Sequence, residues 1–78
     1  MTEKEFIAEI VEIIEADPKE VTLDSDFRKS ADYWSSLTGF CILVFLQDKC
    51  GTTLPVEDFL EMNTIAELYD ATKKDKYL

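Results

Sequence analysis

The sequence predicts an all-α fold, a small four-helix bundle that forms a single domain over residues 1–78. Apolar residues recur at helical spacing in several segments, and no segment shows the alternation that is typical of a strand. Two Thr/Glu pairs at a separation of three residues have the signature of helix-capping boxes. With 46% hydrophobic residues, the chain has the composition of one folded core and not of a disordered segment.

The first helix is predicted over residues 2–16, where isoleucine, valine and phenylalanine alternate with glutamate at a helical period. Thr2 and Glu5 would cap its start, and Asp17-Pro18 would end it. Residues 19–34 have no sustained period and form a long polar connection. The apolar residues that would anchor this connection are Val21, Leu23, Phe27 and Trp34. Connections of this length are uncommon in a small domain and are often functional.

The C-terminal half of the chain predicts three further helices, the first of them running from Ser36 to about Cys50. Gly51 can adopt the left-handed conformation that ends such a helix. Pro55 can open a short third helix, and Thr64 starts the last one. The residues expected to face the core from these two last helices are Val56, Phe59, Leu60, Ile65, Leu68 and Tyr69.

The composition excludes several kinds of catalytic and metal site. The chain has no histidine, so a serine or cysteine triad with a histidine base is excluded. Zinc sites of the usual type are nearly excluded, because only Cys41 and Cys50 remain as thiolate ligands. Nine positions apart in one helix, their Cα atoms would lie about 13 Å apart along the axis, beyond disulfide reach. We expect two buried or half-buried free thiols, a usage that suits a reducing cytoplasm.

The charge and the N-terminal segment indicate where the protein acts and which partners it avoids. The net charge of −9 argues against binding to nucleic acid or anionic membranes and favours partners with basic surfaces. The start, MTEKEFIAEI, is acidic and has neither a basic region nor a cleavage site, so no signal peptide is expected. No apolar run approaches the length of a membrane span. We therefore expect a cytoplasmic protein without membrane insertion.

The pair Ser35-Ser36 stands directly before the long apolar run of the second helix. Local physical chemistry alone would make one of these serines the helix N-cap. The spacing of later residues adds more information. The positions that follow the pair in a recognisable pattern are Leu37, Phe40, Leu43, Leu46, Leu54-Pro55 eighteen residues after Ser36, Asp58, Thr64-Ile65 and Leu68.

This layout resembles the acyl carrier protein family, whose members are four-helix bundles with a long loop after helix one and a short third helix. Their motif is Asp-Ser-Leu at the start of helix two. An Ile/Leu-Pro pair, a short acidic helix and a Thr-Ile or Thr-Val pair follow at fixed distances. Here the resemblance runs without a gap from Ser36 to about Thr72 and extends less tightly over the first helix.

The resemblance implies that Ser36, flanked by Ser35 and Leu37, carries a 4′-phosphopantetheine arm derived from coenzyme A. A phosphopantetheinyl transferase would attach the arm, and acyl ligases, synthases and acyltransferases would use it. The protein would hold acyl or aminoacyl groups as thioesters for fatty-acid, polyketide or related biosynthesis and would not itself be an enzyme. Ser35 replaces the aspartate of the family motif, which transferases use to recognise their target.

The alternative is a carrier fold that has lost modification and serves as an adaptor for partner enzymes. Ser35 and the scarcity of acids on the second helix, where Asp48 is the only acid between Ser35 and Gly51, favour this alternative. Retention of Ser36 and Leu37 at the expected places opposes it.

The second helix is apolar on nearly every side, so a single buried stripe cannot use all of it. If Phe40, Leu43 and Leu46 serve the core, other apolar side chains lie near the surface and form a partner interface or a self-association surface. The candidate partner-binding residues are Trp34, Cys41, Val44, Phe45, Asp48 and Asp58.

Two alternatives concern the same residues. A wider core with a long acyl cavity would also use the extra apolar side chains of the second helix. Full burial of Phe45 in a monomer would exclude the interface interpretation. For Trp34, the alternative is simple packing of the long connection onto the bundle.

Overall fold

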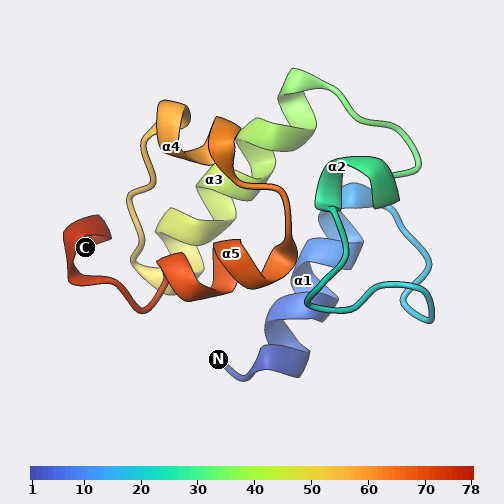
Figure 1. Ribbon diagram of the computed structural model, residues 1–78, viewed down its shortest axis with the longest axis horizontal. Helices are drawn as coiled ribbons and strands as arrows, with labels where there is room; N and C mark the ends of the chain where they lie inside the picture. Colours follow the sequence, from blue (N-terminus) through green and yellow to red (C-terminus); the bar gives the residue numbers. More distant parts are fainter.

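The computed structural model describes residues 1–78 and contains five α-helices and a C-terminal 3-10 turn, with no strand (Figure 1). The elements are α1 (Glu3–Ile14), α2 (Phe27–Ser30), α3 (Ser36–Cys50), α4 (Val56–Glu61), α5 (Ile65–Ala71) and η1 (Asp75–Tyr77). Helix α1 contacts α2, α3 and α5. The predicted all-α fold, with a short helix before the last one, is confirmed. None of the helices combines the length and the apolar character needed to cross a membrane.

Both predicted capping boxes are present. The Thr2 amide donates to Glu5 Oε1 at 2.9 Å, and the Glu5 amide donates to Thr2 Oγ1 at 3.2 Å. Thr64 and Glu67 repeat this exchange at the start of α5 with distances of 3.0 and 3.2 Å. Because the backbone donors favour the ionised carboxylate, they lower the pKa of Glu5 and of Glu67. Each box therefore satisfies amides that a helix start leaves unpaired.

Helix ends follow from backbone conformation. Gly51 ends α3 in the left-handed region, with φ of 62°, as its sequence position predicts. Helix α1 ends earlier than predicted, at Ile14, because Glu15 adopts the left-handed conformation with φ of 56°. Pro55 precedes α4 as its N-cap and has an extended conformation.

The long connection between α1 and α3 contains the one-turn helix α2, which the sequence does not predict. Asp26 caps this turn by accepting hydrogen bonds from the amides of Arg28 and Lys29 at 2.9 and 3.0 Å. The connection is tied to the start of α5, because the Ile65 amide donates to the Ser25 carbonyl at 3.1 Å. Val21 is buried, as expected of an anchor residue. A single turn is too short to show a period, so only its cap residue signals it.

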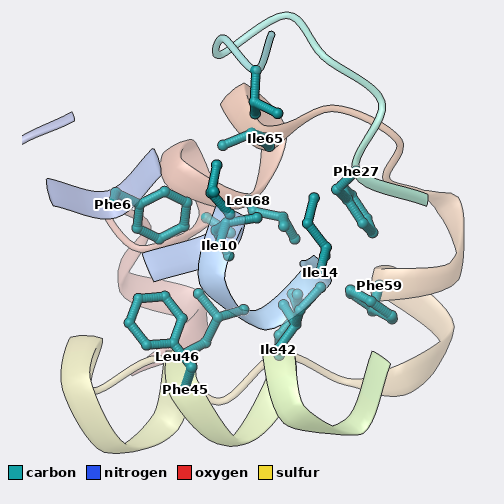
Figure 2. Close-up of a cluster of buried hydrophobic side chains, with 14 of the residues drawn as sticks. Phe6, Ile10, Ile14, Phe27, Ile42, Phe45, Leu46, Phe59, Ile65 and Leu68 are labelled. Carbon is teal, nitrogen blue, oxygen red and sulfur yellow. The ribbon is translucent and has the colours of Figure 1, made fainter. Parts of the chain in front are cut away.

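The core lies between α1, α3 and α5 and is closed at one end by α2 and α4 (Figure 2). Its labelled side chains are Phe6, Ile10 and Ile14 from α1, Phe27 from α2, Ile42, Phe45 and Leu46 from α3, Phe59 from α4, and Ile65 and Leu68 from α5. Two aromatic pairs contribute to it. The ring centroids of Phe6 and Phe45 are 5.6 Å apart, and those of Phe27 and Phe59 are 5.5 Å apart.

The rotation of α3 about its axis differs from the predicted one. Phe45 is buried, with 7% of its surface exposed, whereas Phe40 is 60% exposed. The expectation that Phe40 belongs to the core and Phe45 lies near the surface is therefore wrong. Ile42, Phe45 and Leu46 share the face toward α1, where Phe45 packs on Phe6 (Figure 2). When a helix is apolar on all sides, its own sequence does not determine which face is buried, and packing against neighbouring helices decides it.

Three smaller expectations about burial are also wrong. Val56 and Leu60 of α4 are exposed, and only Phe59 of that helix is buried. Cys41 is an exposed free thiol, whereas Cys50 is half-buried as expected. Burial raises the pKa of the Cys50 thiol, since it penalises the thiolate.

Candidate functional site

The two serines at the start of α3 have different structural roles. Ser35 is the N-cap in an extended conformation, and its hydroxyl accepts a hydrogen bond from the Thr38 amide at 3.4 Å. Thr38 Oγ1 accepts in return from the Ser35 amide at 3.4 Å. Ser36 is the first helical residue and is exposed. Because Ser35 supplies the cap, the Ser36 hydroxyl is available at the surface.

The surroundings of Ser36 suit a phosphate group. The first turn of α3 contains no acidic residue. The first backbone hydrogen bond of α3 is donated by the Gly39 amide to the Ser35 carbonyl at 3.2 Å. The amides of Ser36 and Leu37 come before this bond in the sequence, so they have no carbonyl partner within the helix, and they lie at the positive end of the helix dipole. A phosphodiester on Ser36 would therefore meet free donors and a favourable field.

Ser36 lies at the edge of an open groove of about 380 Å³ between α3 and α4. The groove is lined by Arg28, Trp34, Ser36, Gly39, Phe40, Leu43, Val56, Phe59 and Leu60. Gly39 gives the groove its shape at the helix backbone. A Cβ there would lie 3.3 Å from Phe59 Cε2 and 3.4 Å from Trp34 Cζ2, so glycine lets both rings approach α3 closely. The groove combines apolar walls with a serine at its edge.

Arg28 fixes α4 in place as one wall of this groove. Its guanidinium donates to the carbonyl of Phe59 at 3.0 Å and to the carbonyl of Met62. These carbonyls lie at the end of α4, and that of Phe59 also accepts from the Met62 amide at 3.1 Å. The same guanidinium lies 4.7 Å from the ring centroid of Phe27 and 5.1 Å from that of Phe59. Sequence reasoning missed Arg28 and Gly39, because neither belongs to a motif or a periodic pattern.

The structure gathers some of the predicted site residues and separates others. Ser35, Ser36, Leu37 and Trp34 lie together at the start of α3. Trp34 is half-buried and its ring centroid is 5.8 Å from that of Phe27, which supports the packing interpretation. Cys41, Val44 and Asp48 are exposed along the same helix. Phe45 is in the core. The interface interpretation that required an exposed Phe45 is therefore excluded.

Asp58, one of the predicted partner-binding residues, forms an internal contact. It is half-buried on α4 and accepts a hydrogen bond from the Tyr77 hydroxyl, with 2.8 Å between the two oxygens. The contact ties η1 to α4. This hydrogen bond, together with burial and the nearby negative charge, raises the pKa of Tyr77.

The Tyr77 contact predicts a pH-dependent stability difference between the parent protein and Tyr77→Phe. Because the folded protein holds the Tyr77 proton more tightly than the unfolded chain does, the stabilisation is complete below pH about 10. It is lost as the pH rises through the raised folded-state pKa. Urea unfolding should show a higher midpoint for the parent at pH 8 and a shrinking difference above pH 10. Tyr33→Phe, at a residue that is 73% exposed, is the control and should show no such trend.

Comparison with known proteins agrees with this geometry. The family model described as a phosphopantetheine attachment site matches residues 4–72. An acyl carrier protein of Rhodococcus erythropolis is 35% identical to this chain over 71 residues, which cover 86% of this chain and 77% of that protein. No solved structure matches.

Because the family model covers most of the chain, the protein belongs to the phosphopantetheine-binding acyl carrier family. Its class is therefore that of carriers and not of catalysts. The cofactor of this class is a covalently attached 4′-phosphopantetheine. The surface of the protein around Ser36 fits that group, because an exposed hydroxyl, free amides and an apolar groove meet there.

Proposed function

We propose that Ser36 carries the 4′-phosphopantetheine arm and that this chain delivers acyl or aminoacyl groups to biosynthetic enzymes. The proposal rests on one observation, which is that the two serines have different structural roles. Ser35 caps α3 through Thr38, which leaves the Ser36 hydroxyl exposed and unneeded for folding. When attached, the arm supplies the thiol that holds the cargo as a thioester.

The chain's own residues contribute position and electrostatics to the attachment. Ser36 provides the oxygen, and the first-turn amides of α3 provide donors for the phosphodiester. The base and the coenzyme A would come from a phosphopantetheinyl transferase, since the chain has no histidine to serve as a base. Ser35 in place of aspartate means that the transferase must recognise its target through other residues of this surface.

The cargo is proposed as an acyl group of fatty-acid, polyketide or related specialised biosynthesis. The apolar groove that starts at Ser36 supports an acyl cargo, because its walls are mainly aliphatic and aromatic side chains. Acyl ligases, synthases and acyltransferases are the partners that such a carrier serves. The two free cysteines support a reducing compartment such as the cytoplasm.

The proposed function is tested by loading the protein from an acyl-coenzyme A with a broad-specificity transferase. The mass should rise by the acyl-phosphopantetheine group, and hydroxylamine should then remove only the acyl part, because it cleaves a thioester and leaves the phosphodiester intact. Absence of any mass gain with several transferases would contradict the proposal.

An unmodified adaptor is the second candidate function. Two observations favour it: Ser35 replaces the motif aspartate, and α3 exposes apolar side chains where a partner could bind. Under this alternative the protein binds partner enzymes without carrying cargo. Failure of modification, together with binding to a biosynthetic enzyme, would support the adaptor.

A further inference from the structure

The groove beside the attachment serine carries a positive charge, although the protein as a whole is acidic. The α3–α4 groove, which Ser36 lines, contains a single charged side chain, that of Arg28, and no acidic residue lines it. The whole chain has 17 acidic residues against 8 basic ones. The acidic residues of α4, Glu57, Asp58 and Glu61, lie outside the groove lining. A group tethered at Ser36 therefore meets a cation in this groove and no carboxylate.

Three aromatic rings hold the Arg28 guanidinium in place. It lies 4.7 Å from the ring centroid of Phe27, 5.1 Å from that of Phe59 and 5.6 Å from that of Trp34. The Arg28 side chain is half-buried, so these rings keep part of the surrounding water away from it. The cation–π contacts and the planar shape of the guanidinium fix its orientation before a ligand arrives. A ligand that binds Arg28 consequently costs little additional side-chain entropy.

Arg28 has hydrogen-bond donors that the fold does not use. A guanidinium has five N–H groups. One donates to the Phe59 carbonyl at 3.0 Å and another to the Met62 carbonyl, and no carboxylate of the chain accepts from Arg28. The structural role at the end of α4 thus accounts for two donors only. The remaining donors favour an anionic acceptor, because charge-assisted hydrogen bonds are stronger than those between neutral groups.

We propose that Arg28 makes this carrier selective for cargo whose far end bears a carboxylate, compared with neutral cargo of similar length. The acyl chain packs between Leu43 and Phe59, and its terminal carboxylate accepts hydrogen bonds from the free N–H groups of Arg28. The groove volume of about 380 Å³ is at the lower end for ligand sites, which suits a short acyl chain. The inference rests on the proposed function, because the cargo must be tethered at Ser36 to enter the groove.

The experiment compares two cargoes that differ in their terminal charge. The protein is loaded from adipyl-coenzyme A or heptanoyl-coenzyme A with a broad-specificity transferase, and loading is verified by mass. Hydroxylamine then cleaves each thioester, and each rate is divided by that of the same thioester of free coenzyme A. Arg28→Gln should raise the relative cleavage rate of the adipyl group about threefold more than that of the heptanoyl group, because only the adipyl group loses an ionic contact.

Lys29→Gln is the matched control, since it removes the same charge from an exposed neighbour that does not line the groove. This variant should leave both relative rates as they are in the parent. Arg28→Lys keeps the charge but loses the fork of donors, and its adipyl rate should fall between those of the parent and Arg28→Gln. Equal acceleration of both cargoes in Arg28→Gln would show that Arg28 only supports the wall of the groove, and would overturn the proposal.

A second measurement needs no variant. Arg28 is the only arginine of the chain, so its side-chain Nε–H signal in a nuclear magnetic resonance spectrum is assigned without ambiguity. This signal should move when heptanoyl cargo is replaced by adipyl cargo. The same signal with both cargoes would overturn the proposal, and a shift already present with the arm alone would identify the phosphodiester as the anion that Arg28 binds. Absence of any mass gain on loading would instead contradict the proposed function itself, so the two failures are distinguishable.

Discussion

Ser36→Ala should abolish attachment of the phosphopantetheine arm and leave the stability of the fold almost unchanged. The Ser36 hydroxyl is exposed, and the cap of α3 is formed by Ser35 with Thr38. Removing an exposed group that makes no cap contact typically changes the free energy of unfolding by less than about 0.5 kcal/mol. The measurements are incorporation of labelled coenzyme A by a broad-specificity transferase, and urea unfolding followed by circular dichroism.

Ser35→Ala is the matched control, because it changes the neighbouring serine in the same way. This variant should keep the arm but lose about 1 kcal/mol of stability, the usual cost of removing a serine N-cap. The two variants thus separate modification from capping. Loss of the arm in Ser35→Ala with retention in Ser36→Ala would contradict the assignment of the two roles.

Phe27→Ala should cause the largest loss of stability among single substitutions in the region of the site. Phe27 is fully buried and stacks on Phe59 at a centroid distance of 5.5 Å, with Trp34 at 5.8 Å. Truncation of a buried phenylalanine to alanine costs about 3–5 kcal/mol. A domain of 78 residues has a total stability of about 4–12 kcal/mol at typical values per residue. The variant should therefore be partly unfolded or have a greatly reduced urea midpoint.

Phe40→Ala removes the same atoms from an exposed position and serves as the control for Phe27→Ala. Because Phe40 is 60% exposed, its loss should cost well under 1 kcal/mol. Urea unfolding of the two variants gives the comparison directly. Similar costs for both would show that α2 and α4 do not depend on the aromatic cluster around Phe27.

The sequence predicts those parts of the fold that depend on local chemistry. The capping boxes at Thr2 and Thr64 and the glycine end of α3 are set by hydrogen bonds and backbone conformations within a few residues. Such signals need no knowledge of the rest of the chain. The all-α fold and the order of the longer helices follow from them, together with the apolar period.

The rotation of α3 could not be predicted in the same way. Its residues are apolar on every side, so the sequence offers two faces of similar hydrophobicity. Tertiary packing decides which face is buried. Phe45 packs against Phe6 of α1, whereas Phe40 has no such partner and is exposed. The one-turn helix α2 could not be predicted for a different reason. Its stability comes from the Asp26 cap and from contacts with residues far away in the sequence.

The candidate site was partly visible in the sequence. Spacing and family resemblance point to Ser36, but they do not say which serine caps the helix. That distinction needs the backbone conformation of Ser35 and the position of Thr38. The role of Arg28 could not be predicted from the sequence, because its acceptors are the carbonyls of Phe59 and Met62, more than thirty residues away.

The most direct test of the account is an intact mass of the parent protein after incubation with coenzyme A and a broad-specificity transferase, followed by fragmentation to locate the added group. We predict a gain of one phosphopantetheine, located on Ser36. An unmodified protein with several transferases, or an arm located on Ser35, would contradict the account.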